Sequence, residues 1–234
     1  MMKKTLGPLG MGLLGVSSKY RKQSEQEMFH LIELILKNNV SYVDTATVYG
    51  EEKYQTNRVL SEVFKSMPDI QTGVVNKFGL DLSEFMDPLE ALKREYEDMK
   101  RLFGEDRIIA HVIHRLSSET LDRDIELLTF LRKENPTVKL GVCTNNEVLL
   151  ADLLECVHVD FVQVAINLLD FYNNLSILDL AKQNGVLVQA RSVLSSGLLN
   201  GEYDVSSFSH FKDSIRKRYA QSDDSIQKYT LRIS

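Results

Sequence analysis

Short runs of apolar and β-branched residues alternate with longer amphipathic segments along most of this chain, and this alternation limits its fold more than any other feature. Such a pattern is typical of repeated βα units, in which helices cover a parallel sheet. We predict strands at 9–15, 41–46, 72–78, 107–114, 138–144, 159–166 and 186–192. We predict helices at 25–39, 51–66, 87–104, 117–134, 146–157 and 173–185.

Residue types at the helix ends support several of these boundaries. Pro88 is suited to the first turn of a helix, and Gly104 is suited to the position just past its end. Ser117 or Ser118 is a candidate N-cap for the next helix. Gly185 closes the last predicted helix. The mixed charges of KREYEDMKR, at 93–101, are interpreted as a solvated helix face.

The strand candidates favour a single α/β domain over residues 1–234, a (β/α)8 barrel of the TIM type. The structural rival is a doubly wound open sheet, which usually carries a G-x-G-x-x-G turn after its first strand. LGPLGMGLLG is rich in glycine but lacks that spacing. In a barrel, functional side chains lie at the C-terminal ends of the strands.

Composition narrows the function classes. The net charge of −5 and the intermixed charges leave no basic stripe for nucleic acid. No apolar run approaches the roughly 20 residues that span a bilayer. The N-terminal segment from Lys3 only superficially resembles a signal peptide, because its apolar run contains four glycines and a proline. Two cysteines, Cys143 and Cys156, suggest free thiols in a reducing compartment. We therefore expect a cytoplasmic protein that acts on small molecules.

Polar residues stand at the predicted strand ends. They are Asp44 with Tyr49, Asn76 with Lys77, His114, Cys143 with Thr144, Gln163 with Asn167, and Arg191. Taken singly, each has an ordinary structural interpretation, such as a turn cap for Asp44 or a core histidine for His114. A barrel, however, brings neighbouring strand ends into one mouth.

Together, four of these residues suit proton transfer to a carbonyl oxygen. A phenol has an unperturbed pKa near 10, and a neighbouring ammonium group lowers that pKa. A carboxylate keeps the lysine charged, and a histidine can donate a hydrogen bond to the carbonyl. Asp44, Tyr49, Lys77 and His114 supply this set.

At these positions the sequence resembles the aldo-keto reductase family. The resemblance is carried by YVDTATVYG, VVNKFG, HVIH, LGVCTNN, FVQVAIN and VQARSVLSSGLLNGEY, in that order. It implies a (β/α)8 barrel that uses NADPH, less often NADH, to reduce an aldehyde or ketone to an alcohol. It also implies that Tyr49 donates the proton, Lys77 lowers the pKa of Tyr49, Asp44 pairs with Lys77, and His114 orients the substrate carbonyl.

The same resemblance implies a set of cofactor contacts. Gln163 and the residues after the GV pair, Cys143, Thr144 and Asn145, fall where the family holds the nicotinamide carboxamide. Arg191 falls beside the nicotinamide, and residues 195–201 resemble the loop over the pyrophosphate. A flexible connector is the alternative interpretation of that loop. The implied set is completed by Gly12, Asp44, Ser192, Leu194, Gly197 and Leu199. No metal site is expected.

The chain departs from the family pattern in three places. Cys143 and Thr144 stand where the family has Ser-Asn, and Cys143 is a poorer hydrogen-bond partner, unless Thr144 or Asn145 substitutes for it. The N-terminal hairpin is expected to be reduced, and the last βα unit is expected to be missing. Residues 207–234 instead suggest two helical pieces. The basic cluster at 216–218 is either a phosphate contact or, the simpler interpretation, a solvated helix face.

Two other function classes remain open from the sequence. One is a barrel that binds a nucleotide or a partner without turnover. The other is an aldolase in which Lys77 forms a Schiff base, although a carboxylate partner at Asp44 opposes this by raising the lysine pKa. The absence of tryptophan weakly favours a polar, sugar-like substrate. The sequence leaves the choice of NADPH or NADH and the oligomeric state open.

Overall fold

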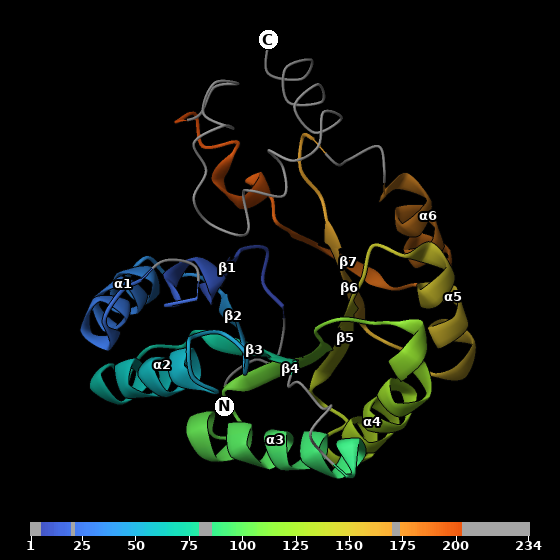
Figure 1. Cartoon of the computed structure of the whole chain (residues 1–234), viewed down its shortest axis with the longest axis horizontal. Coiled ribbons are helices and arrows are strands. Elements are labelled where there is room, and N and C mark those ends of the chain that lie inside the picture. Colours follow the sequence, from blue (N-terminus) through green and yellow to red (C-terminus); the bar gives the residue numbers. More distant parts are fainter. Residues whose placement is uncertain (1–5, 20–21, 80–85, 170–173, 203–234) are drawn as a thin grey trace.

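Seven parallel strands form a single sheet in chain order, from β1 to β7. The computed structural model describes residues 6–19, 22–79, 86–169 and 174–202. The strands are β1 (Gly10–Gly12), β2 (Tyr42–Ala46), β3 (Gly73–Phe78), β4 (Ile108–Ile113), β5 (Lys139–Cys143), β6 (Phe161–Ala165) and β7 (Leu187–Arg191). The sheet curls around a central axis, with the helices on its outer side (Figure 1). The predicted barrel class is therefore confirmed.

Six α-helices alternate with the strands along the described chain. They are α1 (Glu25–Lys37), α2 (Gln55–Ser66), α3 (Pro88–Phe103), α4 (Leu121–Glu134), α5 (Glu147–Cys156) and α6 (Leu175–Gln183). Short 3-10 turns lie at η1 (Leu13–Val16), η2 (Ser118–Thr120) and η4 (Ser195–Gly197). Every predicted strand and helix is found, with boundaries that differ by a few residues.

Local sequence explains where the helices begin and end. Ser24 and Glu27 form a capping box at the start of α1, which satisfies backbone N–H groups that have no partner within the helix. Asp87 caps α3 by accepting from the backbone N–H of Glu90, and Pro88 occupies the first turn. Gly104 follows α3 with a φ of +75°, a conformation that favours glycine.

Two predicted helix starts are wrong. Neither Ser117 nor Ser118 caps α4, because residues 118–120 form the 3-10 turn η2 and the helix begins only after Thr120. The helix predicted from residue 51 begins at Gln55, because residues 51–54 form a turn and Tyr54 has a left-handed backbone with a φ of +64°. In both cases the amphipathic pattern of the sequence continues through the turn, and the predicted helix therefore began too early.

The core has an outer and an inner part. Between the sheet and the helices, two clusters bury leucine, isoleucine and valine side chains, each worth about 1.5–3 kcal/mol when fully buried. Inside the curled sheet, a smaller cluster contains Tyr42, Val75, Val112 and Phe161. Phe161 lies against Gly141, where an added Cβ would approach its ring within 2.6 Å. These side chains form the floor beneath the polar residues described below.

Some sequence expectations concern the ends of the chain. Residues 6–9, which precede β1, form no strand. The expected loss of the last βα unit, the two helical pieces at 207–234 and the basic cluster at 216–218 lie outside the described residues. Among the described residues, β1 pairs only with β2, and β7 pairs only with β6. No helix in the described part is long and apolar enough to cross a bilayer.

Candidate active site

The alternation of side chains along β2 brings Asp44 to the inside of the curled sheet. Val43 packs in the outer core, and the Thr45 hydroxyl donates to Asn57 of α2 at 2.6 Å. Asp44 lies between these two residues and therefore faces inward, as Tyr42 does. Only 7% of Asp44 is exposed.

Lys77 reaches Asp44 from the neighbouring strand. It lies opposite Ala46 in the β2–β3 register, is 6% exposed, and forms an ion pair with the Asp44 carboxylate. Burial lowers the pKa of Lys77, but the Asp44 carboxylate and the Tyr49 phenol outweigh burial and raise it above its ordinary value. Lys77 is therefore a buried ammonium group that is charged at neutral pH.

Tyr49 is held beside this ion pair by the turn that follows β2. Its backbone N–H donates to the carbonyl of Ala46 at 3.0 Å, and its own carbonyl accepts from the N–H of Thr56 at 3.2 Å. The side chain is buried, with the Lys77 Nζ 5.1 Å from the centre of its ring. The predicted neighbours Asp44, Lys77 and Tyr49 thus lie together.

His114 completes the group from the end of β4. Its backbone N–H donates to the carbonyl of Phe78 at 3.0 Å, and its ring lies edge-on to the Tyr49 ring, with the ring centres 5.7 Å apart. Gly79 leaves room for the imidazole, because a Cβ at this position would lie 2.8 Å from the His114 Nδ1. The four predicted catalytic side chains therefore meet at one point.

The pKa values of Tyr49 and His114 are shifted in opposite directions. For Tyr49 the shift is opposite to the lowering by Lys77 that the resemblance implied. Burial raises the pKa of Tyr49, and the opposing effect of Lys77 is smaller, so the pKa lies above its ordinary value. Burial, followed by the charges of nearby lysine and arginine side chains, lowers the pKa of His114 to about 3. At neutral pH the phenol keeps its proton and the imidazole is uncharged.

Gln163 of β6 connects Asp44 to a hydrogen-bond chain across the interior. Its amide nitrogen donates to the Asp44 carboxylate at 2.6 Å and to the Gln189 carbonyl oxygen at 2.9 Å. The Gln189 amide in turn donates to the Tyr42 hydroxyl at 2.7 Å. Among the described residues, the buried Oε1 of Gln163 has no hydrogen-bond partner. It remains available as an acceptor.

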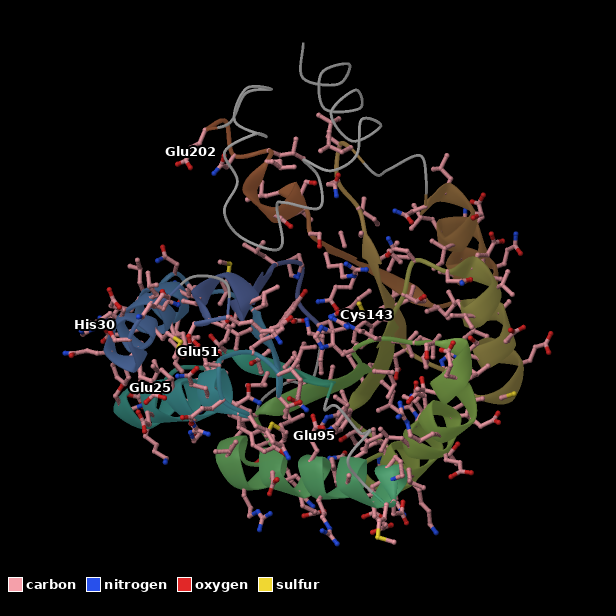
Figure 2. All side chains as sticks on the ribbon, in the orientation of Figure 1. Glu25, His30, Glu51, Glu95, Cys143 and Glu202 are labelled. Carbon is pink, nitrogen blue, oxygen red and sulfur yellow. The ribbon has the colours of Figure 1, made fainter. Side chains whose placement is uncertain are left out.

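The three residues that follow the GV pair have different environments. Cys143 lies on the inner side of the sheet (Figure 2), and burial raises the pKa of its thiol, which disfavours a reactive thiolate. The Thr144 hydroxyl accepts from the N–H of Asn146 at 2.9 Å. The Asn145 side-chain oxygen accepts from the N–H of Ala165 and from the Arg191 guanidinium, both at 3.0 Å. Asn145 thus joins the end of β5 to the ends of β6 and β7, whereas the Thr144 hydroxyl makes a local contact within the loop after β5.

The segment after β7 has an unusual backbone. Positive φ angles occur at Ser192, Ser195, Ser196 and Gly197. Such a backbone can turn N–H groups toward an anion. Leu194 is 54% exposed, whereas Leu199 is half-buried. Gly12, at the end of β1, has open space where a side chain would stand. Apart from Asp44 in β2, the predicted cofactor residues therefore lie in or directly after β1, β5, β6 and β7.

A cavity of about 710 Å³ opens beside His114, between the N-terminal ends of α3 and α4. Its lining includes Lys19, Val48 and Arg115, together with Arg123 and Asp124 of α4. The sequence interpretation missed Lys19 and Arg115. Lys19 stands at no predicted strand end, and Arg115, which directly follows the strand predicted at 107–114, resembles any solvated charge.

Glu95 contradicts the interpretation of 93–101 as a solvated face. Figure 2 shows it on the side of α3 that faces the sheet, and it is 0% exposed. Its carboxyl accepts a hydrogen bond from the Thr47 hydroxyl, which also lies 3.4 Å from the backbone carbonyl of Lys77. Burial raises the pKa of Glu95 to about 8, and the hydrogen bond from Thr47 and the charge of Lys53 offset only part of this effect. The sequence did not distinguish Glu95 from its exposed neighbours, because it stands in a run of mixed charges.

Asn76 and Asn167 are the other two strand-end residues. The first is buried in the core, and the second forms a hydrogen bond between two loops. Asn76 is 0% exposed, and among the described residues its side-chain amide has no hydrogen-bond partner. The Asn167 amide donates to the carbonyl of Ser192 at 3.2 Å, which joins the loops after β6 and β7. In the described part of the chain, no three histidine, cysteine or acidic side chains are grouped to hold a metal ion.

Comparison with protein families gives one match. The model of the aldo/keto reductase family matches residues 8–229 of the chain. A comparison of the sequence with curated proteins gives no match.

Several solved structures have a similar fold. An aldo-keto reductase from Bacillus halodurans, in its holo form, has a TM-score of 0.67 and 20% identity, and the match covers 85% of this chain and 68% of that chain. A glycerol dehydrogenase from Gluconobacter oxydans has a TM-score of 0.68 and 20% identity, with 87% and 66% covered. An aldo/keto reductase from Klebsiella pneumoniae, in complex with NADP and acetate, has a TM-score of 0.61 and 18% identity, with 94% and 73% covered. The chain thus spans about two thirds of the first two neighbours.

Proposed function

The chain belongs to the aldo/keto reductase family, and we propose that it is an NAD(P)H-dependent oxidoreductase that reduces an aldehyde or ketone to an alcohol. One observation carries this proposal. A buried phenol, Tyr49, lies beside an ammonium group, Lys77, that is charged at neutral pH, and beside an uncharged imidazole, His114. This arrangement suits a carbonyl oxygen that becomes negative and takes up a proton.

Each residue has a defined task in the proposed reaction. The neutral His114 ring donates an N–H hydrogen bond to the substrate carbonyl and orients it. The Tyr49 hydroxyl transfers its proton to the oxygen as negative charge develops there. Lys77 stabilises the phenolate that remains, and Asp44 holds the ammonium in place through the buried ion pair. The raised pKa of Tyr49 keeps the proton on the phenol until that moment.

The residues around the mouth are suited to a nicotinamide cofactor. When bound, the cofactor supplies the hydride. The buried Gln163 Oε1 is free to accept from a carboxamide N–H, and the Arg191 Nε and Ser195 hydroxyl nearby along the chain also lack a partner within the described part. All three polar atoms lie at or after β6 and β7. We assign the nicotinamide to Gln163, Cys143 and Arg191, and the pyrophosphate to residues 192–199.

We propose NADPH as the cofactor, with NADH as the alternative. The NADP complex of the structural neighbour from Klebsiella pneumoniae supports this choice. The free thiols of Cys143 and Cys156 support a reducing, cytoplasmic location. The substrate is a small carbonyl compound. The aldolase alternative loses support, because a Schiff base requires an uncharged lysine, whereas Asp44 and Tyr49 keep the pKa of Lys77 raised.

A hydride-transfer assay tests the proposal. The full chain is incubated with NADPH deuterated at the transferable position and with a panel of aldehydes and ketones, and the alcohol products are analysed by mass spectrometry. We expect deuterium at the former carbonyl carbon of at least one product. Nucleotide binding without a labelled alcohol from any carbonyl would instead support the non-catalytic binding barrel.

A further inference from the structure

Lys19 lines the cavity beside His114 and contacts the turn that follows β2. Lys19 is exposed, and its ammonium group lies 3.4 Å from the backbone carbonyl of Val48, the residue that precedes Tyr49. Lys19 therefore lies next to the turn that holds the proton donor. Among the described residues, it forms no ion pair.

A second cation enters the same cavity from β4. Arg115 directly follows His114, is exposed, and also has no ion pair within the described part of the chain. The third cation of the cavity wall differs, because Arg123 pairs with Asp124 at 2.6 Å and its charge is compensated. Within the described part of the chain, the cavity thus keeps two positive charges without an ion-pair partner, although the net charge of the whole chain is −5.

The two cations line the same cavity as His114, the residue proposed to orient the carbonyl group. Burial lowers the pKa of His114 most, and the charges of Lys77, Arg115, Arg191 and Lys19 lower it further. Lys77 is balanced by Asp44, and Arg191 bonds to Asn145 on the side assigned to the nicotinamide. Of these four cations, Lys19 and Arg115 are the two on the substrate side that have no ion-pair partner among the described residues.

We propose that the substrate carries an anionic group, a carboxylate or a phosphate ester, and that Lys19 and Arg115 bind this group while His114 orients the carbonyl. Lysine and arginine are the side chains that bind such oxyanions through charge-assisted hydrogen bonds. A single substrate contacts all three residues only if its anionic group lies a few bonds from its carbonyl. This inference rests on the proposed function and narrows its substrate class.

Two matched probe pairs test the inference. One pair is 4-oxobutanoate and its uncharged methyl ester, and the other is glyceraldehyde 3-phosphate and glyceraldehyde. We expect the full chain to have a kcat/KM at least about tenfold higher for the charged member of one pair, which is the typical effect of one hydrogen bond to a charged group. The pair that shows the preference distinguishes carboxylate from phosphate. Equal kcat/KM values within both pairs would overturn the inference and leave the proposed function intact.

Charge-removing variants identify the residues responsible. We expect Lys19→Gln and Arg115→Gln each to reduce the charged-to-uncharged ratio of kcat/KM by about tenfold, mainly through KM. The matched control is Lys37→Gln, which removes an exposed cation of α1 that pairs with Glu33. This control should keep the wild-type ratio. An unchanged ratio in both cavity variants would also overturn the inference.

A binding measurement separates the inference from the proposed activity. Line broadening of the 4-oxobutanoate and glyceraldehyde 3-phosphate resonances reports binding without turnover. If neither the probes nor the panel of aldehydes and ketones is reduced, but one charged probe binds the wild type and binds the two cavity variants about tenfold more weakly, the proposed function fails and the anion site stands. If no charged probe binds in preference to its uncharged partner and none is reduced, both fail.

Discussion

The ammonium group of Lys77 lies 5.1 Å from the centre of the Tyr49 ring. At this distance, inside the curled sheet, each group shifts the pKa of the other. Burial raises the pKa of Tyr49 by more than Lys77 lowers it. The phenol keeps its proton at neutral pH and releases it only to a stronger base, which suits a proton donor to a developing alkoxide.

The ion pair between Asp44 and Lys77 should dominate the stability of the site. Asp44→Asn leaves Lys77 buried without its carboxylate, and we expect the free energy of unfolding to fall by about 3–5 kcal/mol. The double variant Asp44→Asn with Lys77→Met buries no charge and should lose clearly less. Urea denaturation measures both values. A single variant as stable as the double variant would contradict this prediction.

Glu95 should make stability depend on pH. Its pKa is about 8 in the folded protein and near its ordinary value of 4.5 in the unfolded chain. The folded state therefore binds the proton more tightly, so the contribution of Glu95 to stability is fully present below pH 4.5 and is lost as the pH rises toward 8. We expect the advantage of Glu95→Gln over the wild type to grow across this range.

The measurement for Glu95 is urea denaturation at several pH values across that range. The matched control is Glu97→Gln, which changes an exposed glutamate of the same helix. This control should follow the wild type at every pH. A constant difference between Glu95→Gln and the wild type would show that the Glu95 pKa is not raised.

Gln163 should contribute to nucleotide affinity through its free carbonyl oxygen. Gln163→Met keeps the length of the side chain and removes this acceptor, so we expect the Kd for NADPH to rise by about tenfold. Quenching of nucleotide fluorescence measures the Kd. The control Gln183→Met, at an exposed position of α6, should bind as the wild type does. Unaltered binding by the Gln163 variant would remove Gln163 from the cofactor site.

Gly79 should determine where His114 stands. A methyl group at this position would lie 2.8 Å from the His114 Nδ1, so Gly79→Ala forces the imidazole to move. We expect a kcat lower by about tenfold or more, since displaced catalytic groups lose rate steeply. Gly15→Ala is the control, because nothing lies within 4 Å of the added Cβ there. Equal kcat values would show that the His114 position is not critical.

The fold, and the grouping of Asp44, Tyr49, Lys77 and His114 in space, could be predicted from the sequence because both follow from the order of the strands. The alternation of side chains along a strand predicts that Asp44 and Lys77 point to the inside of the sheet. A barrel also brings consecutive strand ends together, independently of the conformation of the loops. The net pKa of Tyr49 could not be predicted in this way. This pKa depends on how deeply the Tyr49 ring is buried. The sequence predicts which charged residues are neighbours of the ring, but it does not predict the extent of its burial.

Other features depend on contacts between distant segments. Gln189 bonds to Tyr42 across 147 residues of sequence, and Lys19 meets the carbonyl of Val48 from a separate loop. Glu95 looks like any charge on an amphipathic helix until α3 is packed against the sheet. No spacing rule reports such contacts, which exist only after the chain has folded.

The central claim is that Tyr49 gives the proton during carbonyl reduction. Its most direct test is the single-turnover rate of NADPH oxidation with a reducible aldehyde, compared between the wild type, Tyr49→Phe and the control Tyr54→Phe, whose hydroxyl bonds to Asp98 at 3.0 Å outside the proposed site. We predict that Tyr49→Phe binds NADPH as tightly as the wild type but reacts about 10²–10⁴-fold more slowly, whereas Tyr54→Phe keeps the wild-type rate. A Tyr49→Phe protein that reduces the aldehyde at the wild-type rate would contradict the claim.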